Sequence, residues 1–373
     1  MVSVEEIADK IEEVLPKERP INHHEPFINK HRALIEISKC LTAGIQDYNP
    51  VEQFEEWIRN YTGAKYVLAT NSGTSALHLA LLVAGIKPND EVVIPTTTFV
   101  ATANAVSYIG AIPHFVDAGP YLDPNQLETY LYKLRNKGSR IRAIIAVHLF
   151  GNSCDIKYLV KIAKDYGLVL IEDACQALGT KVDNRHVGTF GHTGVFSFNN
   201  NKILTTNGGG VLITNDKDTY EKAYKLSIMG RVKHKYLIEH DSSGFNYRMS
   251  AVNASLGLSQ TSDFEETLEK KRNLAKRYQE SLGNLVEFVK PTIECSQNHW
   301  LNTILVDNRD ELLEELNFRG IKARASFTPL HMLSFYDLFN QNYTDNIKEI
   351  EMIKSIEFFE RAVCLPSGSL SIE

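Results

Sequence analysis

The sequence predicts an α/β fold in which a large domain with a mostly parallel, seven-stranded sheet precedes a smaller α+β domain. The chain has 373 residues, more than the roughly 250–300 at which a single hydrophobic core stops growing. Between residues 51 and 215, amphipathic helical segments alternate with short apolar, β-branched runs, which is typical of repeated strand–helix units in a parallel sheet. After about residue 250 the alternation ends. We therefore expect two domains, 1–250 and 251–373, with an N-terminal helical segment in the first.

The elements of the large domain follow from the spacing of its apolar residues. Short apolar runs predict the strands Lys65–Ala69, Glu91–Pro95, Ile112–Val116, Arg142–Val147, Leu168–Glu172, Thr193–Phe198 and Gly209–Ile213. Helical spacing predicts the helices Ser75–Ala84, Val100–Tyr108, Gln126–Lys137 and Ile156–Tyr166. In the second domain, the pattern predicts a long charged helix over Phe264–Leu282, a strand over Trp300–Val306 and a helix over Arg309–Arg319 that Gly320 closes.

The composition excludes several classes of protein. Forty basic against forty-six acidic residues give a net charge of −6, and no dense basic run could follow a phosphate backbone, so nucleic acid is not an expected partner. The N-terminus lacks the pattern of a signal peptide, and no apolar stretch approaches the ~18 residues of a membrane helix. The five cysteines are scattered without metal-ligand spacing. We expect a cytoplasmic protein with reduced cysteines, no metal and no membrane contact.

A phosphate site is predicted at Asn71–Leu77, where a strand ends and a helix begins. Gly73 allows close approach of the backbone, and Thr74 and Ser75 offer hydroxyl and N–H groups at the positive end of the helix. An ordinary helix cap made by serine or threonine is the alternative interpretation.

Asp173 lies at the predicted carboxyl end of the buried run Leu168–Glu172, where open α/β sheets bind ligands. A carboxylate there can pair with a protonated pyridine nitrogen, so that the ring acts as an electron sink. A helix N-cap carboxylate is the competing interpretation.

Lys202 follows an aromatic–serine–aromatic strand and precedes the glycine run Gly208–Gly210. Its position after the acidic turn at Asp173 is typical of an enzyme that holds an aldehyde cofactor as a Schiff base. An apolar site would lower the pKa of the amine and favour its nucleophilic form, and Ser197 is available to a phosphate. A surface lysine is the alternative.

Two further residues have weaker signals. Phe99 could lay its ring on a flat cofactor, although a core position is the alternative. His148 ends a predicted strand at the carboxyl edge of the sheet, where either a substrate contact or a structural histidine is possible.

In chain order, these motifs resemble the sugar aminotransferases of the DegT/DnrJ/EryC1/StrS family, from about Phe54 to Pro366. The resemblance implies fold type I and the cofactor pyridoxal 5'-phosphate. It implies that Lys202 forms the Schiff base and moves a proton, that Asp173 holds the pyridine nitrogen and that Gln176 lies near the ring. The remaining roles that it implies are ring stacking by Phe99, phosphate binding by Thr74, Ser75 and Ser197, and a contribution of Asn246 from the second subunit of a homodimer with shared active sites.

The same resemblance bears on the reaction. Lysine at position 202 argues for transamination, because a branch of the family that lost this lysine consists of 3-dehydratases. Glutamate is the expected donor and a keto-sugar the acceptor. The stretch Thr205–Gly210 departs from the usual family pattern at Asn207 and at Gly208, where it lacks the acidic residue. The turn should survive because asparagine tolerates left-handed backbone angles.

The substrate expected from the resemblance is a nucleotide-linked 4-keto-6-deoxy-N-acetylhexose, aminated at C4 for nonulosonic (legionaminic-type) acids or a surface glycan. Candidate contacts to its sugar or diphosphate are Arg231, Arg324 and His331, with plain surface or loop positions as the alternative. A GDP-linked 4-keto-6-deoxymannose or an octulosonate carbonyl is the rival acceptor. A regulator that binds sugar nucleotide or cofactor without chemistry is the rival from another class of protein.

Overall fold

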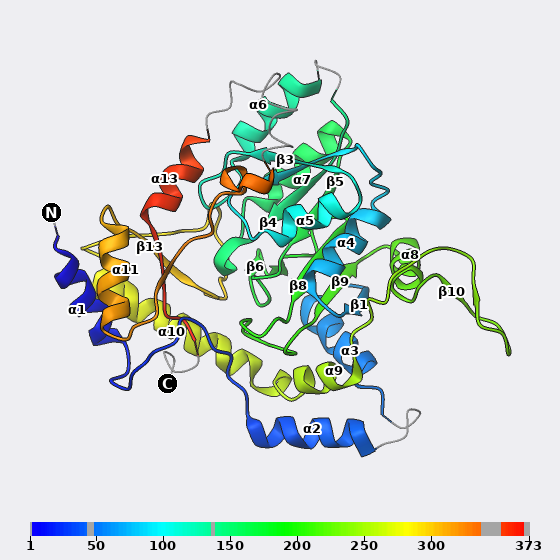
Figure 1. Cartoon of the computed structure of the whole chain (residues 1–373), viewed down its shortest axis with the longest axis horizontal. Coiled ribbons are helices and arrows are strands. Elements are labelled where there is room, and N and C mark those ends of the chain that lie inside the picture. The colour runs from blue at the N-terminus through cyan, green and yellow to red at the C-terminus, as the bar shows by residue number, and fades with distance from the viewer. Residues whose placement is uncertain (1, 43–47, 136–138, 337–351, 369–373) are drawn as a thin grey trace.

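A seven-stranded sheet with helices on both faces forms the centre of the molecule, and a second, smaller sheet lies beside it (Figure 1). The computed structural model describes residues 2–42, 48–135, 139–336 and 352–368. The predicted α/β class is confirmed.

The large sheet has the strand order β1-β9-β8-β5-β4-β2-β3. Its strands are β1 (Tyr66–Thr70), β2 (Glu91–Pro95), β3 (Ile112–Val116), β4 (Ile141–Val147), β5 (Val169–Asp173), β8 (Thr193–Ser197) and β9 (Gly210–Thr214). All seven predicted strands are present, each within a residue or so of its expected ends. β9 runs antiparallel to β1 and β8, while β3, β2, β4, β5 and β8 pair in parallel. The carboxyl ends of β4, β5 and β8 therefore meet at one edge of the sheet.

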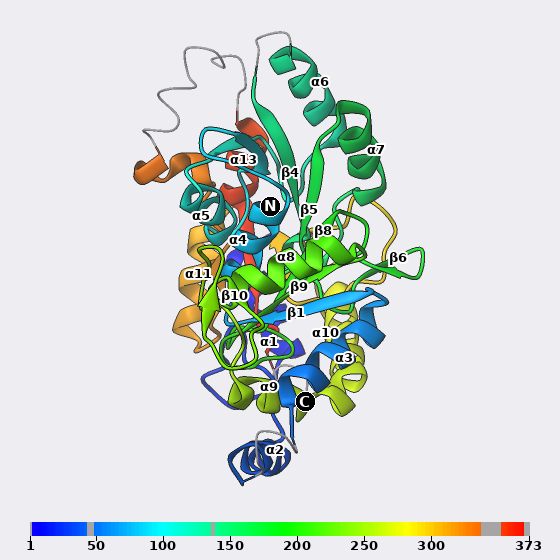
Figure 2. The same cartoon turned by 90° about the vertical axis from the view of Figure 1, so that its right-hand side faces the viewer.

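Helices cover both faces of this sheet, as the turned view in Figure 2 shows. They are α3 (Pro50–Thr62), α4 (Gly73–Val83), α5 (Ala101–Tyr108), α6 (Pro124–Arg135), α7 (Ile156–Tyr166), α8 (Lys217–Ser227) and α9 (Ala251–Leu258). Two short hairpin pairs, β6 (Lys181–Val182) with β7 (Arg185–His186) and β10 (Arg231–Val232) with β11 (Glu239–His240), stand apart from the sheet.

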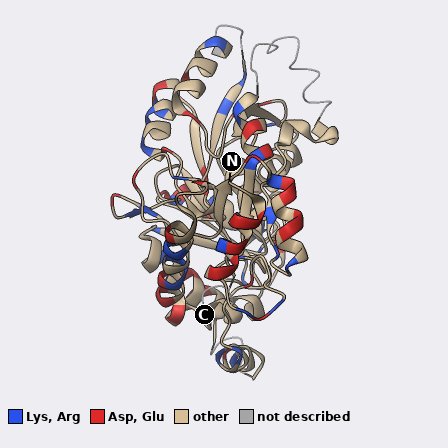
Figure 3. Cartoon of the chain, turned by 90° about the vertical axis from the view of Figure 1, so that its left-hand side faces the viewer, with Lys and Arg blue, Asp and Glu red and all other residues tan. Residues whose placement is uncertain are grey.

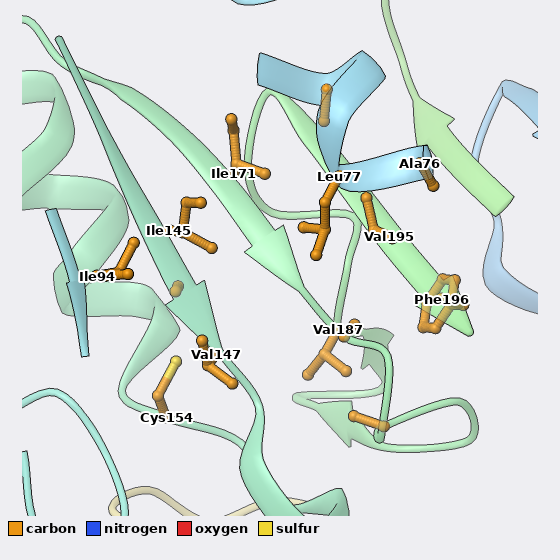
Figure 4. Packing of buried hydrophobic residues seen from close by; sticks show 14 of the residues in the cluster. Ala76, Leu77, Ile94, Ile145, Val147, Cys154, Ile171, Val187, Val195 and Phe196 are labelled. Carbon is orange, nitrogen blue, oxygen red and sulfur yellow. The ribbon is translucent and has the colours of Figure 1, made fainter. Parts of the chain in front are cut away.

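The core around the large sheet is built from buried apolar side chains of its strands and of the helices that cover it. Figure 4 shows Leu77 of α4 directed at the sheet near Ile171 of β5 and Val195 of β8, and all three side chains are buried. Nearly every residue of α4 is buried, because this helix lies between the sheet and its neighbours α5 and α8. Burial on all sides fixes the start of α4 relative to the ends of β5 and β8.

The second unit is an antiparallel sheet with the order β12-β13-β15-β14, covered by helices. Its elements are β12 (Glu287–Phe288), β13 (Asn302–Leu305), β14 (Arg324–Ala325), β15 (Ala362–Leu365), α10 (Phe264–Leu282), α11 (Arg309–Phe318) and α13 (Ile353–Arg361). The predicted helix Phe264–Leu282 has its expected ends, whereas the strand expected over Trp300–Val306 is shorter, because Trp300 and Leu301 form a bend. The smaller α+β unit is thus present.

The N-terminal helix α1 (Val4–Val14) contributes to the core of this second unit. Ile7, Ile11 and Val14 lie in one buried cluster with Leu274 of α10 and Leu316 of α11. Sequence spacing placed the N-terminal helical segment in the large domain, whereas its apolar face packs on the C-terminal unit. The boundary at residue 250 stays a prediction.

Two segments project from the body. Helix α2 (Lys30–Thr42) lies against α9 at one end of the molecule and exposes Leu34 and Leu41, and the β10–β11 segment exposes Tyr236 and Ile238 (Figures 1 and 2). Such apolar exposure on projecting elements is typical of surfaces that contact another chain.

The charged surface mixes both signs. Figure 3 shows acidic and basic residues interspersed along the helices on the side of the second unit, and α10 carries the i,i+4 pairs Lys270–Glu266 and Lys276–Glu280. In the described part of the chain, no helix is long and apolar enough to cross a membrane. The five cysteines form no disulfide.

Candidate active site

A cavity of about 280 Å³ opens at the carboxyl edge of the large sheet, next to the second unit. Eight of the residues predicted for the site line it: Gly73, Thr74, Phe99, Asp173, Gln176, Ser197, Lys202 and Arg324. Motifs that are distant in the chain therefore meet in one place, because the carboxyl ends of neighbouring parallel strands share an edge.

The N-terminus of α4 forms one wall of the cavity. Ser72 is the N-cap, and its Oγ accepts a hydrogen bond of 3.0 Å from the Ser75 backbone N–H. Gly73 leaves no room for a side chain, since an added Cβ would lie 2.9 Å from Ser197 Cβ. Gly210 also has no room for a side chain, because an added Cβ there would lie 2.5 Å from the backbone nitrogen of Gly73. Glycine at these positions leaves the backbone N–H groups of the first helical turn accessible to an anion.

Two of the predicted phosphate ligands differ in their surroundings. Thr74 lines the cavity, but the buried Ser75 does not, and its hydroxyl donates to Asn71 Oδ1 at 2.6 Å. The cap that the sequence left as an alternative is thus present, and it is made by Ser72. The cap leaves Gly73 and Thr74, the first two residues of the helix, facing the cavity.

Asp173 ends β5, and both of its carboxylate oxygens accept hydrogen bonds. Thr102 Oγ1 donates to Oδ2 at 2.8 Å, and the Cys175 backbone N–H donates to Oδ1 at 3.2 Å. Asp173 is buried and lines the cavity. The two contacts hold the carboxylate in a defined orientation, from which it can bind a cationic ring nitrogen.

Gln176 and Phe99 both line the cavity. Gln176 Oε1 accepts a hydrogen bond of 2.6 Å from the Phe150 backbone N–H, so its side chain is fixed. Phe99 is 52% exposed, and its ring lies 5.7 Å from that of Phe327. An aromatic ring that is half-exposed at a cavity wall is available to stack on a flat ligand.

Lys202 extends from the turn after β8 into the cavity. Burial lowers the pKa of its amine to about 8, and Arg324 adds to this effect, while Cys175 and Asp173 oppose it. A neutral amine is therefore accessible near neutral pH, as nucleophilic addition to an aldehyde requires. The Nζ atom lies 4.0 Å from the centre of the Trp300 ring.

His148 does not line the cavity. Its side chain is fully buried, and Nε2 lies 3.0 Å from Glu172 Oε2. Burial opposes protonation, but Cys154 and the Glu172 carboxylate outweigh it and raise the pKa of His148. Glu172 also accepts backbone N–H bonds from Gly188, Phe190 and Gly191. The geometry favours the structural histidine that the sequence left open, rather than a substrate contact.

Three more predicted residues lie outside the cavity lining of this chain. Arg231 is exposed on β10. Asn246 is also exposed, and its backbone carbonyl accepts a hydrogen bond of 3.2 Å from Asn71 Nδ2. His331 lies 2.7 Å from Thr96 Oγ1 through Nδ1, and burial lowers its pKa. The substrate and partner-site roles of these residues stay predictions.

Sequence reasoning missed Thr102 and gave Trp300 no role at the site. Thr102 is the second residue of α5 and follows Phe99 by three positions. Residues three apart at the start of a helix lie on the same side of it. A threonine three positions after the ring residue was therefore a usable signal. Trp300 carried no such signal, because its contact with Lys202 depends on packing between the two units.

The donor set of the cavity fits pyridoxal phosphate. The glycine-lined start of α4 suits a phosphate, Asp173 suits a protonated pyridine nitrogen and Lys202 supplies an amine of lowered pKa. Asn201 Oδ1, also at the cavity, is buried and has no hydrogen-bond partner among the described residues. In the described residues, no three His, Cys, Asp or Glu side chains cluster as metal ligands would.

Comparisons with known proteins agree with this geometry. The DegT/DnrJ/EryC1/StrS aminotransferase family matches residues 29–370. GDP-perosamine synthase of Escherichia coli O157:H7 is 36% identical over 291 residues, 77% of this chain and 79% of that protein. The UDP-4-amino-4,6-dideoxy-N-acetyl-beta-L-altrosamine transaminase of Campylobacter jejuni is 31% identical over 341 residues, 85% of this chain and 84% of that protein.

A solved structure extends the likeness to the fold. PseC of Helicobacter pylori, an aminotransferase involved in the biosynthesis of pseudoaminic acid, has a TM-score of 0.83 and 26% identity, over 93% of this chain and 94% of that one. The predicted fold type I is confirmed by such neighbours. The chain belongs to the DegT/DnrJ/EryC1/StrS aminotransferase family and is a pyridoxal-phosphate-dependent sugar aminotransferase.

Proposed function

We propose that the protein transfers an amino group from glutamate to C4 of a nucleotide-linked 4-keto-6-deoxy-N-acetylhexose, for a nonulosonic acid or another surface glycan. One observation carries the chemistry: the Lys202 amine shares a single cavity with Asp173 and the start of α4. The name of the Campylobacter relative supports an N-acetylated dideoxy sugar as the class of substrate. The Helicobacter relative is involved in the biosynthesis of pseudoaminic acid, which supports a place in sugar-acid synthesis. The cytoplasmic location expected from the sequence is part of this proposal.

Each residue of the site has a role in this reaction. Pyridoxal phosphate, when bound, supplies an electron sink next to the carbon that gains or loses the amino group. Gly73, Thr74 and Ser197 would hold its phosphate at the N-terminus of α4, and Asp173 would pair with its ring nitrogen. Lys202 Nζ would accept a proton from the substrate carbon and return it, because its pKa of about 8 is close to working pH.

The walls of the cavity also favour this reaction over side reactions with water. Phe99, Phe327 and Trp300 give the cavity aromatic walls, which suit a flat ring and keep water from the reacting carbon. Arg324 is the one predicted substrate contact at the cavity of this chain, and its guanidinium could bind a carboxylate or phosphate of either substrate.

A homodimer with shared sites is part of the proposal. Asn246 and Arg231 lie outside the cavity of their own chain on an exposed surface. The projecting α2 and β10–β11 segments carry exposed apolar side chains, which a second copy would cover. Each of these features is compatible with Asn246 reaching the cofactor of the partner chain.

A second acceptor has its own support. GDP-perosamine synthase is a GDP-linked relative at 36% identity, so GDP-linked 4-keto-6-deoxymannose remains the rival substrate. The octulosonate carbonyl has no such relative among the proteins compared above.

A panel of ketosugars tests the proposal. The purified protein with pyridoxal phosphate and glutamate is incubated with UDP-linked 4-keto-6-deoxy-N-acetylhexose and with GDP-linked 4-keto-6-deoxymannose, and the amine product is followed by mass. We expect preferred conversion of the N-acetylhexose. Conversion of the GDP sugar alone would move the assignment to the rival. Lys202→Ala should remove turnover with either sugar, and retained turnover in that variant would exclude the mechanism.

A further inference from the structure

Trp300 contacts both Lys202 and the residue before it. The Lys202 amine lies over the indole ring, 4.0 Å from its centre, and the indole Nε1–H donates to the backbone carbonyl of Asn201 at 2.8 Å. One side chain therefore contacts the reacting amine and the backbone of the residue just before it. We infer that Trp300 is a positioning residue that seats the free Lys202 amine, an inference that rests on the role of Lys202 proposed above.

The ring itself has little freedom. Trp300 is 2% exposed, and its backbone N–H donates to Asn298 Oδ1 at 2.8 Å. The amide of Asn298 in turn donates to the carbonyls of Gln176 and Leu178, both at 2.9 Å. This ties the backbone of Trp300 to the chain that follows β5, and hence to the same turn that carries Gln176.

A buried lysine holds the other side of Trp300. Lys271 of α10 donates to the Trp300 carbonyl at 3.2 Å and to the Ser367 carbonyl at 2.5 Å. Its side chain is buried, and burial lowers its pKa to about 7. The hydrogen bond from Lys271 to the Trp300 carbonyl fixes the Trp300 backbone to α10. The residue therefore cannot move away from Lys202 without breaking buried polar contacts.

The contact with the Trp300 ring suits an amine that must stay free to react. In the described part of the chain, no carboxylate lies within ion-pair distance of Lys202 Nζ, and Asp173 is engaged by Thr102 and Cys175. A carboxylate partner would raise the pKa of the amine and hold it firmly. An aromatic face attracts the cation more weakly, so the amine is oriented and still free to react.

The contact joins the two units of the molecule. Lys202 follows β8 of the large sheet, whereas Trp300 precedes β13 of the second sheet. The second unit therefore contributes directly to the reactivity of the lysine, beyond closing one side of the cavity.

Fluorescence of the protein without cofactor tests the contact directly. The chain has two tryptophans, and Trp57 packs against Phe54, Tyr61 and Phe264, none of which lines the cavity. In a Trp57→Phe background, emission comes from Trp300 alone, and we expect it to change with pH with a midpoint near the Lys202 pKa of about 8.

Controls separate Lys202 from the other titratable groups that face the indole. Those groups are His24, whose ring lies 5.7 Å from that of Trp300, and Lys271, which contacts the backbone carbonyl of Trp300 rather than its ring. Adding Lys202→Met to the Trp57→Phe background should remove the transition near pH 8 while leaving any change due to Lys271 or His24. A transition that persists unchanged after Lys202→Met would overturn the contact.

A second measurement tests the positioning role. We expect Trp300→Leu to slow the capture of pyridoxal phosphate by the cofactor-free protein at least about tenfold, followed by absorbance, with a fall in kcat and little change in KM for the sugar. Trp300→Phe should lie in between, because it keeps a ring face and loses the N–H donor. The matched control Trp57→Phe should capture at the unaltered rate.

The outcomes are distinguishable from failure of the proposed function. If the unaltered protein captures no pyridoxal phosphate, the role of Lys202 fails. If it captures normally, and both Trp300 variants match Trp57→Phe, the positioning role of Trp300 is refuted while the proposed function stands.

Discussion

At the scale of single residues, the amine of Lys202 has the property on which the chemistry depends. Burial lowers its pKa from 10.5 to about 8. Only the neutral amine adds to an aldehyde, so the rate of pyridoxal phosphate capture by the cofactor-free protein should rise with pH and level off above about 8. The measurement is the second-order capture rate between pH 6 and pH 10, followed by absorbance.

The comparison for this prediction is a free lysine amine in solution, whose capture rate continues to rise toward its ordinary pKa near 10.4. A protein profile that coincides with that of the free amine would show that the buried, low-pKa environment of Lys202 does not exist. Lys202→Ala should show no specific capture at any pH.

At the scale of elements, the junction between α4, β8 and β9 decides whether a phosphate can approach. An added Cβ at Gly73 would lie 2.9 Å from Ser197 Cβ and 3.0 Å from Cys175 Sγ, and both neighbours are short side chains held by the sheet. We expect Gly73→Ala to weaken pyridoxal phosphate binding at least about tenfold and to cost about 1–3 kcal/mol of stability. Titration of the cofactor by absorbance and a denaturant midpoint measure the two effects.

Gly119→Ala is the matched control for this element. The nearest atom to its added Cβ is the Lys354 carbonyl oxygen at 4.0 Å, which is ordinary contact. Cofactor affinity and stability should both stay close to those of the unaltered protein. Equal behaviour of the two alanine variants would contradict the close packing of the α4 start.

The turn before β9 shows how an element tolerates an unusual sequence. Asn207 has φ 56° and Gly208 has φ 137°, so the left-handed turn expected for this stretch is present with asparagine in place. Thr205 Oγ1 accepts a hydrogen bond of 2.9 Å from the Asn207 backbone N–H, which stabilises the turn locally. The departure from the family pattern therefore leaves the backbone near Gly210 intact.

At the scale of the whole molecule, the proposed homodimer predicts complementation between two inactive variants. Lys202→Ala removes the amine, and Asn246→Ala removes the side chain proposed to act in the partner's site. In a mixed dimer, one site then combines an intact Lys202 with an intact Asn246 from the other chain. Co-expression in equal amounts should restore about one quarter of the unaltered activity if chains pair at random.

The same experiment contradicts the shared site if no activity returns. When Asn246 acts only in its own chain, every mixed dimer carries one defect in each site and stays inactive. Successive affinity purification of the co-expressed protein on two different tags, one on each variant, isolates the mixed dimers in either case.

The local pattern of residues was enough to predict the large sheet and the chemical groups at its edge. All seven strands and the helix Phe264–Leu282 were predictable, because the period of apolar residues is a local property that each element carries in its own residues. Asp173 and Lys202 were predictable for a related reason. Asp173 ends one buried strand and Lys202 lies in the turn after another, and the carboxyl ends of neighbouring parallel strands meet at one edge.

The surroundings of these groups, by contrast, depend on contacts made in the folded protein. The seating of Lys202 on Trp300, the burial of His148 against Glu172 and the packing of α1 on the C-terminal unit join residues that are distant in the chain. No local periodicity encodes such contacts, because they depend on which faces the folded elements present to one another. The residue types therefore identified the chemistry, and the packing of the two units set the position and the pKa of the amine that performs it.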